Sequence, residues 1–183
     1  IAGDGELTNK TLVILGYGGI GSQVAKLGKA FGMRVTGIRR NPQDDEHADE
    51  VLGLDRFEEL LPLTDYLVLS LPDSPQTRDI INADILEKLS NSAMIINVGR
   101  GTAINEEDLS DALNGEKIAA AALDTTKVEP LDASSSLWTA KNCFISAHDS
   151  AHSLLSLERA FELFFQNIKN IKNGDQIVNL YSE

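Results

Sequence analysis

A glycine-rich segment constrains the fold of this chain more than any other feature, and it consists of Gly16, Tyr17, Gly18, Gly19, Ile20 and Gly21. It follows an apolar run at 11–15 and opens a stretch with apolar residues at helical spacing, namely Ile20, Val24, Ala25, Leu27 and Phe31. In a strand–turn–helix unit of this kind the first glycine permits a tight turn. The second lets a pyrophosphate approach the backbone, and the third lets the helix pack closely on the strand. The segment therefore predicts a dinucleotide-binding turn, with the N–H groups of the helix N-terminus facing the phosphates.

Short apolar runs alternate with helical stretches along the rest of the chain. Besides residues 11–15, the expected strands are residues 34–38, 66–71, 93–98, 117–123 and 143–146. The alanine-rich run at 117–123 is ambiguous because alanine favours helix, but the alternation requires a strand there. The polar, acidic residues 41–50 indicate a solvated loop. About six strands alternating with helices predict an α/β fold with a doubly wound parallel sheet, the Rossmann dinucleotide-binding fold.

The length of 183 residues suits one ordinary domain. We interpret it as a single dinucleotide-binding domain, with a lead-in at about 1–10, a core at 11–150 and a C-terminal helix and tail at 151–183. Asn82 and Asn105 stand where helices are expected to begin, and asparagine is a favoured N-cap. The helices thus have start signals that agree with the strand pattern.

Charge and cysteine content exclude several functional classes. The net charge is −12, and a surface of this sign repels nucleic-acid phosphates and anionic lipids. No apolar run approaches the length of a membrane span, and no signal sequence opens the chain. Cys143 is the only cysteine, which fits a reducing compartment. We therefore expect a cytoplasmic protein that binds neither nucleic acid nor membrane, and we predict no metal site.

The end of the second expected strand bears on the choice of cofactor. Sites for NAD usually place an acidic residue there, which binds the 2′-hydroxyl of the ribose. This chain has Arg39 and Arg40 at that place, and no carboxylate appears before Asp44. Two guanidinium groups suit a 2′-phosphate, although two solvated surface arginines are the alternative. The pattern favours NADP over NAD as the cofactor.

Charged residues follow three further strands, at the edge of the sheet where doubly wound folds carry their chemistry. Arg100, Asp124 and His148 each follow an expected strand, and Glu129 lies shortly after Asp124. Hydride transfer to a 2-oxo acid needs an arginine for the carboxylate and ketone, a histidine to donate a proton, and a carboxylate to orient the histidine. Each residue also has a plain structural interpretation, as a surface charge, a turn residue or a satisfied histidine. His152 is an alternative to His148.

The chain resembles the cofactor-binding domain of the D-isomer-specific 2-hydroxyacid dehydrogenases. The similarity extends over nearly the whole chain in the family's order. It is carried by GYGGIG at 16–21, LPDSPQTRDIIN at 71–82, INVGRGTAINEEDL at 96–109, LDTTKVEP at 123–130, SLW at 136–138 and SAHDSAHS at 146–153. The resemblance implies hydride transfer between a nicotinamide and the C2 atom of a 2-hydroxy or 2-oxo acid.

The resemblance also implies residue roles. Arg100 would bind the substrate carboxylate, His148 would act as the acid/base, Glu129 would support His148, and Asp124 would hold the nicotinamide carboxamide. The nicotinamide and its ribose would be lined by the backbone around Leu71, Pro72, Val98 and Gly99, with Thr77 nearby.

Three departures from the family pattern stand out. Arg39 replaces the aspartate of the NAD-using members, which supports NADP. Ala147 replaces the usual proline before the histidine, so we expect a less constrained loop. Thr125 and Thr126 replace a more apolar pair after Asp124. The three residues implied in catalysis are retained.

Family members also have a substrate-binding domain, largely upstream, and we expect this domain to be missing from these residues. We therefore expect little turnover from these residues alone, and a homodimer when the protein is full length. One alternative function is a non-catalytic nucleotide-sensing or corepressor-like module of the same fold. Another is a 3-hydroxyacid or 6-phosphogluconate type of dehydrogenase. That type needs a lysine at the reacting centre, and no lysine lies at a comparable strand end in a matching motif.

Overall fold

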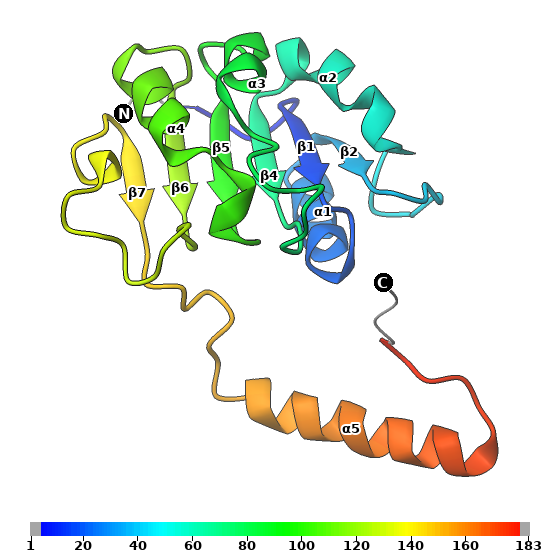
Figure 1. Cartoon of the computed structure of the whole chain (residues 1–183). Coiled ribbons are helices and arrows are strands. Elements are labelled where there is room, and N and C mark those ends of the chain that lie inside the picture. The colour runs from blue at the N-terminus through cyan, green and yellow to red at the C-terminus, as the bar shows by residue number, and fades with distance from the viewer. Residues whose placement is uncertain (1–4, 180–183) are drawn as a thin grey trace. The chain divides into compact units, whose positions relative to one another are not determined.

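The computed structural model describes residues 5–179, which divide into two compact units between His148 and Asp149. The first unit is built around one sheet of seven parallel strands in the order β3-β2-β1-β4-β5-β6-β7 (Figure 1). The strands are β1 (Thr11–Leu15), β2 (Arg34–Ile38), β3 (Glu50–Leu52), β4 (Tyr66–Leu69), β5 (Met94–Asn97), β6 (Ala120–Leu123) and β7 (Cys143–Ile145). The strand order reverses direction between β1 and β4, and such a switch point is where open α/β sheets bind ligands.

This arrangement confirms the parallel α/β fold, with one strand more than the expected number. The additional strand is β3, at the edge of the sheet, and it begins at the end of the stretch interpreted as a solvated loop. It has three residues, and Val51 and Leu52 are only half-buried. A strand so short shows too little hydrophobic alternation to be recognised, and its pairing with β2 decides its conformation.

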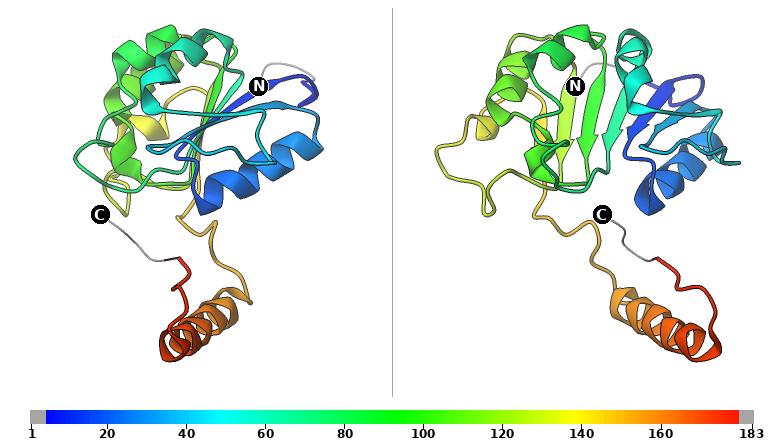
Figure 2. Two further views of the ribbon diagram at one scale, coloured as in Figure 1. Left: turned by 90° about the vertical axis from the view of Figure 1, so that its right-hand side faces the viewer. Right: turned by 45° about the vertical axis from the view of Figure 1, so that its right-hand side comes forward.

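Helices cover both faces of the sheet (Figure 2). On one face lies α1 (Gly19–Ala30), and on the other lie α2 (Phe57–Leu60), α3 (Ala83–Lys88) and α4 (Glu106–Asn114). Short 3₁₀ turns η1 to η4 occupy Leu54–Arg56, Leu61–Leu63, Gly101–Ala103 and Ser136–Trp138. As expected, Asn82 and Asn105 cap α3 and α4, because their side chains accept hydrogen bonds from the N–H groups of Ile85 and Asp108.

The packing of α1 differs from that of an ordinary amphipathic helix. It buries Gly21, Ala25 and Gly28 against the sheet, while the larger Leu27 is 62% exposed. A Cβ atom on Gly28 would lie 2.6 Å from a methyl carbon of Leu12. Small residues on the buried face thus bring the helix axis close to the sheet, which places the helix N-terminus beside the end of β1.

The second unit is dominated by one helix, α5 (Ser156–Asn173), which ends at Gly174 in the left-handed conformation. Its larger apolar side chains, including Phe161, Phe164 and Phe165, are about half exposed. Among residues 5–179 no helix has both the length and the apolar character needed to cross a membrane.

Candidate functional site

The glycine-rich segment forms the turn between β1 and α1. Gly16 has φ of +101°, and a Cβ atom on it would lie 2.7 Å from the carbonyl carbon of Ser70. A Cβ atom on Gly21 would lie 2.7 Å from the carbonyl oxygen of Gly16. By contrast, a Cβ atom on Gly18 would have no neighbour within 4 Å. The first and third glycines are therefore required by close packing, whereas the second borders open space, as a backbone that receives a pyrophosphate does.

The N-terminus of α1 supplies donors at this open position. Gly18 is the N-cap and has no side chain to satisfy the first N–H groups of the helix, and the first turn carries no acidic residue. A helix N-terminus of this kind favours an anion. The turn is held in place from β4, because the Ser70 hydroxyl donates to the Gly16 carbonyl oxygen at 2.8 Å. These residues fit a dinucleotide.

The residues at the ends of β4 and β5 form close-packed backbone turns. The Thr77 hydroxyl donates to the carbonyl oxygen of Pro72 at 2.7 Å and so closes the turn that follows β4. A Cβ atom on Gly99 would lie 2.8 Å from the backbone nitrogen of Leu71. The turn that contains Val98 and Gly99 thus lies directly beside Leu71, at the switch point.

Asn97 is a positioning residue that the sequence reasoning did not single out. Its side chain is fully buried, accepts from the Gly99 N–H at 3.0 Å and donates to the Arg100 carbonyl oxygen at 3.1 Å. Its carbonyl oxygen accepts from the Asp124 N–H at 2.9 Å. The sequence signal that could have revealed this role is an asparagine in an otherwise apolar strand. It couples the turn that carries Arg100 to the end of β6.

Asp124 lies directly after β6, where it is 7% exposed. Its Oδ1 atom accepts a hydrogen bond of 2.6 Å from the hydroxyl of Ser146, which follows β7. Ser146 is a second residue that the sequence reasoning did not assign. The contact ties the ends of two neighbouring strands together.

Glu129 and His148 meet at this same edge of the sheet. The Nδ1 atom of His148 lies 2.8 Å from Oε2 of Glu129, and Oε1 of Glu129 accepts from the Thr126 N–H at 3.1 Å. Hydrogen bonding to His148 lowers the pKa of Glu129 most strongly, followed by the Thr126 N–H and the nearby charge of Arg100. His148 has φ of +55°, in the left-handed region that non-glycine residues seldom adopt and that is frequent at functional sites.

Arg100 is thus close enough to Glu129 for their charges to interact. Its side chain is exposed, and the guanidinium donates one hydrogen bond of 2.9 Å to the Gly99 carbonyl oxygen. Gly101 permits this approach, because a Cβ atom there would lie 2.0 Å from the carbonyl carbon of Thr126. The structure therefore brings Arg100, Glu129 and His148 together. His152 belongs to the second unit.

Arg39 and Arg40 follow β2, half-buried and exposed respectively. Within the described residues neither guanidinium forms a hydrogen bond or ion pair. Both are therefore available to an external anion. They follow Ile38, whose carbonyl oxygen accepts a hydrogen bond of 2.8 Å from the Tyr17 N–H, so they lie near the turn that precedes α1.

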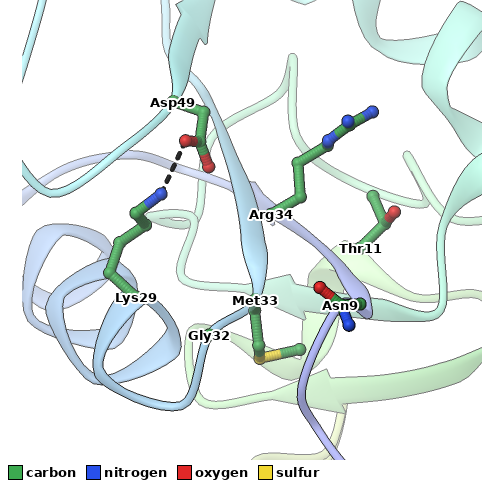
Figure 3. Close-up of a pocket in the computed structure, with 7 residues that line it drawn as sticks. All are labelled: Asn9, Thr11, Lys29, Gly32, Met33, Arg34 and Asp49. Carbon is green, nitrogen blue, oxygen red and sulfur yellow. Dashed lines mark hydrogen bonds and ion pairs between the residues drawn. The ribbon is translucent and has the colours of Figure 1, made fainter.

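A hollow of about 440 Å³ lies at the opposite edge of the sheet, at the amino ends of β1 and β2 (Figure 3). It is lined by Asn9, Thr11, Lys29, Gly32, Met33, Arg34 and Asp49. Lys29 and Asp49 form an ion pair of 2.6 Å across it. None of the site residues predicted from the sequence lines this hollow, so we place the candidate site at the carboxyl edge.

The chain is similar to proteins of one known family. Residues 2–150 match the sequence profile described as D-isomer specific 2-hydroxyacid dehydrogenase, NAD binding domain. The chain is 35% identical over 174 residues to a hydroxypyruvate reductase of Blautia hydrogenotrophica, covering 94% of this chain and 53% of the relative. It is 38% identical over 143 residues to the human glyoxylate reductase/hydroxypyruvate reductase, covering 78% of this chain and 44% of the relative.

A solved structure of similar fold is the NADPH-dependent glyoxylate/hydroxypyruvate reductase of Sinorhizobium meliloti in complex with NADP and sulfate. The TM-score is 0.88 at 28% identity, covering 100% of this chain and 58% of that chain. The chain spans about half the length of the curated relatives that it matches.

Proposed function

The chain belongs to the D-isomer-specific 2-hydroxyacid dehydrogenase family, as an NAD(P)-binding domain, and we propose that it serves the reduction of a small 2-oxo acid by NADPH. The observation that carries this proposal is the pairing of His148 with Glu129 beside Arg100, at the same edge of the sheet as the glycine turn. Glyoxylate and hydroxypyruvate are the substrates to test first, since relatives bear those names.

Each residue has a role that follows from its chemistry. The exposed guanidinium of Arg100 binds the substrate carboxylate and polarises the adjacent ketone. His148 holds a proton at Nε2 and donates it to the ketone oxygen in reduction, or accepts it in oxidation. Glu129 binds Nδ1 of His148 at 2.8 Å, and so fixes the orientation of the ring.

The cofactor would be held along the switch point. The glycine turn and the N-terminus of α1 would bind the pyrophosphate, and the backbone around Leu71, Pro72, Val98 and Gly99, with Thr77 nearby, would line the nicotinamide and its ribose. Asp124 would hold the carboxamide. When bound, the nicotinamide supplies or accepts the hydride.

Arg39 and Arg40 support NADP rather than NAD, because a 2′-phosphate is matched by guanidinium groups that have no partner among the described residues. The alternative of a non-catalytic nucleotide-sensing module is not favoured, since the named relatives are reductases and dehydrogenases. We further propose that the protein is a homodimer when full length and is located in the cytoplasm.

Titration of the chain with NADPH and with NADH tests the cofactor assignment, following energy transfer from Trp138, the only tryptophan. We expect tighter binding of NADPH, with a loss of about tenfold or more in Arg39→Ala/Arg40→Ala, because charge-assisted contacts to the phosphate disappear. Arg34→Ala is the matched control, since Arg34 lies at the opposite edge. Tighter binding of NADH would contradict the NADP assignment and leave the reductase assignment standing.

Reduction of glyoxylate and of hydroxypyruvate with NADPH by the natural full-length protein tests the reaction. We expect turnover of at least one of these acids and its loss in Arg100→Ala. Arg78→Ala is the control, because Arg78 pairs with Asp73 on the neighbouring loop. Normal rates in Arg100→Ala on every accepted 2-oxo acid would contradict the assignment.

A further inference from the structure

The loop that follows β4 comprises residues 72–78 and lies beside the turn that carries Arg100. Its far end is fixed by the backbone, because the Asp79 N–H donates to the carbonyl oxygen of Thr102 at 2.9 Å. Within the loop, the hydrogen bonds of Thr77 go to other residues of the same loop. These bonds give the loop its shape but do not attach its first residues to the neighbouring turn.

Asp73 supplies that attachment. Its Oδ1 atom accepts a hydrogen bond of 2.9 Å from the hydroxyl of Thr102, which comes two residues after Arg100 in the chain. Among the residues that the structure describes, no other side-chain hydrogen bond joins 72–78 to a neighbouring loop. The bond therefore couples the loop to which we assign the nicotinamide to the turn that carries the proposed substrate arginine.

The second partner of Asp73 is Arg78, which belongs to the same loop. The Nε atom of Arg78 donates to Oδ1 of Asp73 at 3.1 Å, and both side chains are exposed. Arg78 lowers the pKa of Asp73 most strongly, and the Thr102 hydroxyl lowers it further. The Asp73 carboxylate is thus ionised at neutral pH, so its bond to Thr102 is charge-assisted, whereas the exposed pair with Arg78 contributes little and attaches the loop to nothing else.

Thr102 is a fixed support for this bond. It is the half-buried middle residue of η3, and its two neighbours in that turn, Gly101 and Ala103, are buried. The Ala103 N–H donates to the carbonyl oxygen of Arg100 at 3.1 Å, and the same oxygen accepts from the buried side chain of Asn97. The turn is held from several sides, so the position of the loop is what depends on the bond.

We propose that Asp73 and Thr102 are positioning residues that hold the loop 72–78 in place for the nicotinamide half of the cofactor. Their bond orders the loop before the cofactor binds, so that little binding free energy is spent on ordering it. The inference rests on the proposed function, because it takes the backbone from Leu71 onward, with Thr77 nearby, as the lining of the nicotinamide.

The experiment compares two ligands by calorimetric titration of the natural full-length protein. One ligand is NADPH, and the other is 2′-phospho-ADP-ribose, which is the same nucleotide without the nicotinamide ring. A bond that only stabilised the fold would affect the binding of both ligands alike. A bond that positions the nicotinamide lining affects the binding of NADPH alone.

Thr102→Val removes the hydroxyl and nearly keeps the shape of the side chain. We expect Thr102→Val and Asp73→Ala each to bind NADPH about fivefold more weakly, because the loop must then be ordered on binding. The affinity for 2′-phospho-ADP-ribose should stay unchanged. The double variant should lose no more than either single variant, since both changes remove the same bond.

Two further variants are controls. Thr102→Ser keeps a hydroxyl donor and should bind NADPH like the wild type. Arg78→Ala removes the other partner of Asp73 and leaves the bond to Thr102, so it should also bind NADPH like the wild type.

An unchanged affinity for NADPH in Thr102→Val, an equal loss for 2′-phospho-ADP-ribose, or losses that add in the double variant would overturn the inference. If the wild type prefers NADH, the same comparison is made with NADH and ADP-ribose. A loss confined to NADH then means that the NADP assignment fails and the inference stands. If the wild type binds NADPH but reduces no 2-oxo acid, the reductase proposal fails, while a loss confined to NADPH still supports the inference. Binding of neither cofactor by the wild type would overturn both.

Discussion

The two edges of the sheet use the same local arrangement of a carboxylate for different purposes. At the amino edge, Asp65 accepts from the Thr11 N–H and from Lys10 at 2.9 Å each. Asp49 likewise accepts from the Val35 N–H at 2.8 Å and from Lys29 at 2.6 Å. Each aspartate thus fixes the beginning of a strand through a backbone N–H group and has a lysine as its second partner.

At the carboxyl edge, Glu129 also accepts from one backbone N–H group, but its second partner is His148. A lysine keeps its charge throughout the neutral range, whereas a histidine gains or loses a proton there. The comparison shows that a hydrogen-bonded carboxylate is not by itself a sign of chemistry. The identity of its partner, and the presence of Arg100 nearby, distinguish the two edges.

The strongest test of this contrast is His148→Asn in the full-length protein. We expect kcat/KM for 2-oxo acid reduction to fall by about 10²–10⁴-fold, because the proton donor is lost. His152→Asn is the matched control and should keep the wild-type rate. A large loss in His152→Asn with none in His148→Asn would assign the acid/base role to the other histidine.

Glu129→Gln should have a smaller effect, of about 10–100-fold in kcat/KM, since the amide is similar in size to the carboxylate but forms a weaker, uncharged hydrogen bond to Nδ1 of His148. Glu107→Gln, at an exposed position of α4, is the control. The measurement is kcat/KM for reduction, and we expect it to fall in Glu129→Gln only. A wild-type rate in Glu129→Gln would contradict a role of this carboxylate in holding His148.

At the amino edge, Asp65→Asn should affect stability and leave the catalytic rate unchanged. Burial favours a higher pKa for Asp65, but the Thr11 N–H and Lys10 outweigh it and lower the pKa. We expect the free energy of unfolding to fall by about 1–2 kcal/mol at neutral pH.

The effect of Asp65→Asn depends on pH in a defined direction. Because the folded-state pKa lies below the unfolded value of about 3.9, the stabilisation is present above that pH and is lost as the pH falls through the folded-state pKa. Denaturant unfolding at several pH values measures this, with the exposed Asp55→Asn as the control. A difference between Asp65→Asn and wild type that persists unchanged below the folded-state pKa would argue against the ionised pair.

The smallest effect is expected for Lys29→Ala. The ion pair with Asp49 is half exposed, and pairs of this kind contribute little because water screens them. The free energy of unfolding should change by less than about 0.5 kcal/mol, as measured by chemical denaturation. A loss above about 2 kcal/mol would mean that the ion pairs at the amino edge contribute more to the free energy of unfolding than exposed pairs usually do.

Much of the fold was predictable because its signals are local. The boundaries of β1 and β2 agree with the sequence prediction, since each apolar run is bounded by turn residues. The edge strand β3 and the burial of Gly28 in α1 were not predictable, because they depend on a partner strand and on close contact with Leu12. The role of Asn97 was not predictable either, since its hydrogen bonds cross from β5 to the end of β6.

By itself the sequence determined which residues follow which strands, and therefore that Arg100, Glu129 and His148 belong to the carboxyl edge. That inference needs only chain order and the rule that parallel strands end on the same side. The tertiary structure alone decided that His148 meets Glu129 at 2.8 Å and that Ser146 donates to Asp124 at 2.6 Å. Contacts of this kind depend on how separate loops fold over the sheet edge, and no local pattern encodes the distance between two loops.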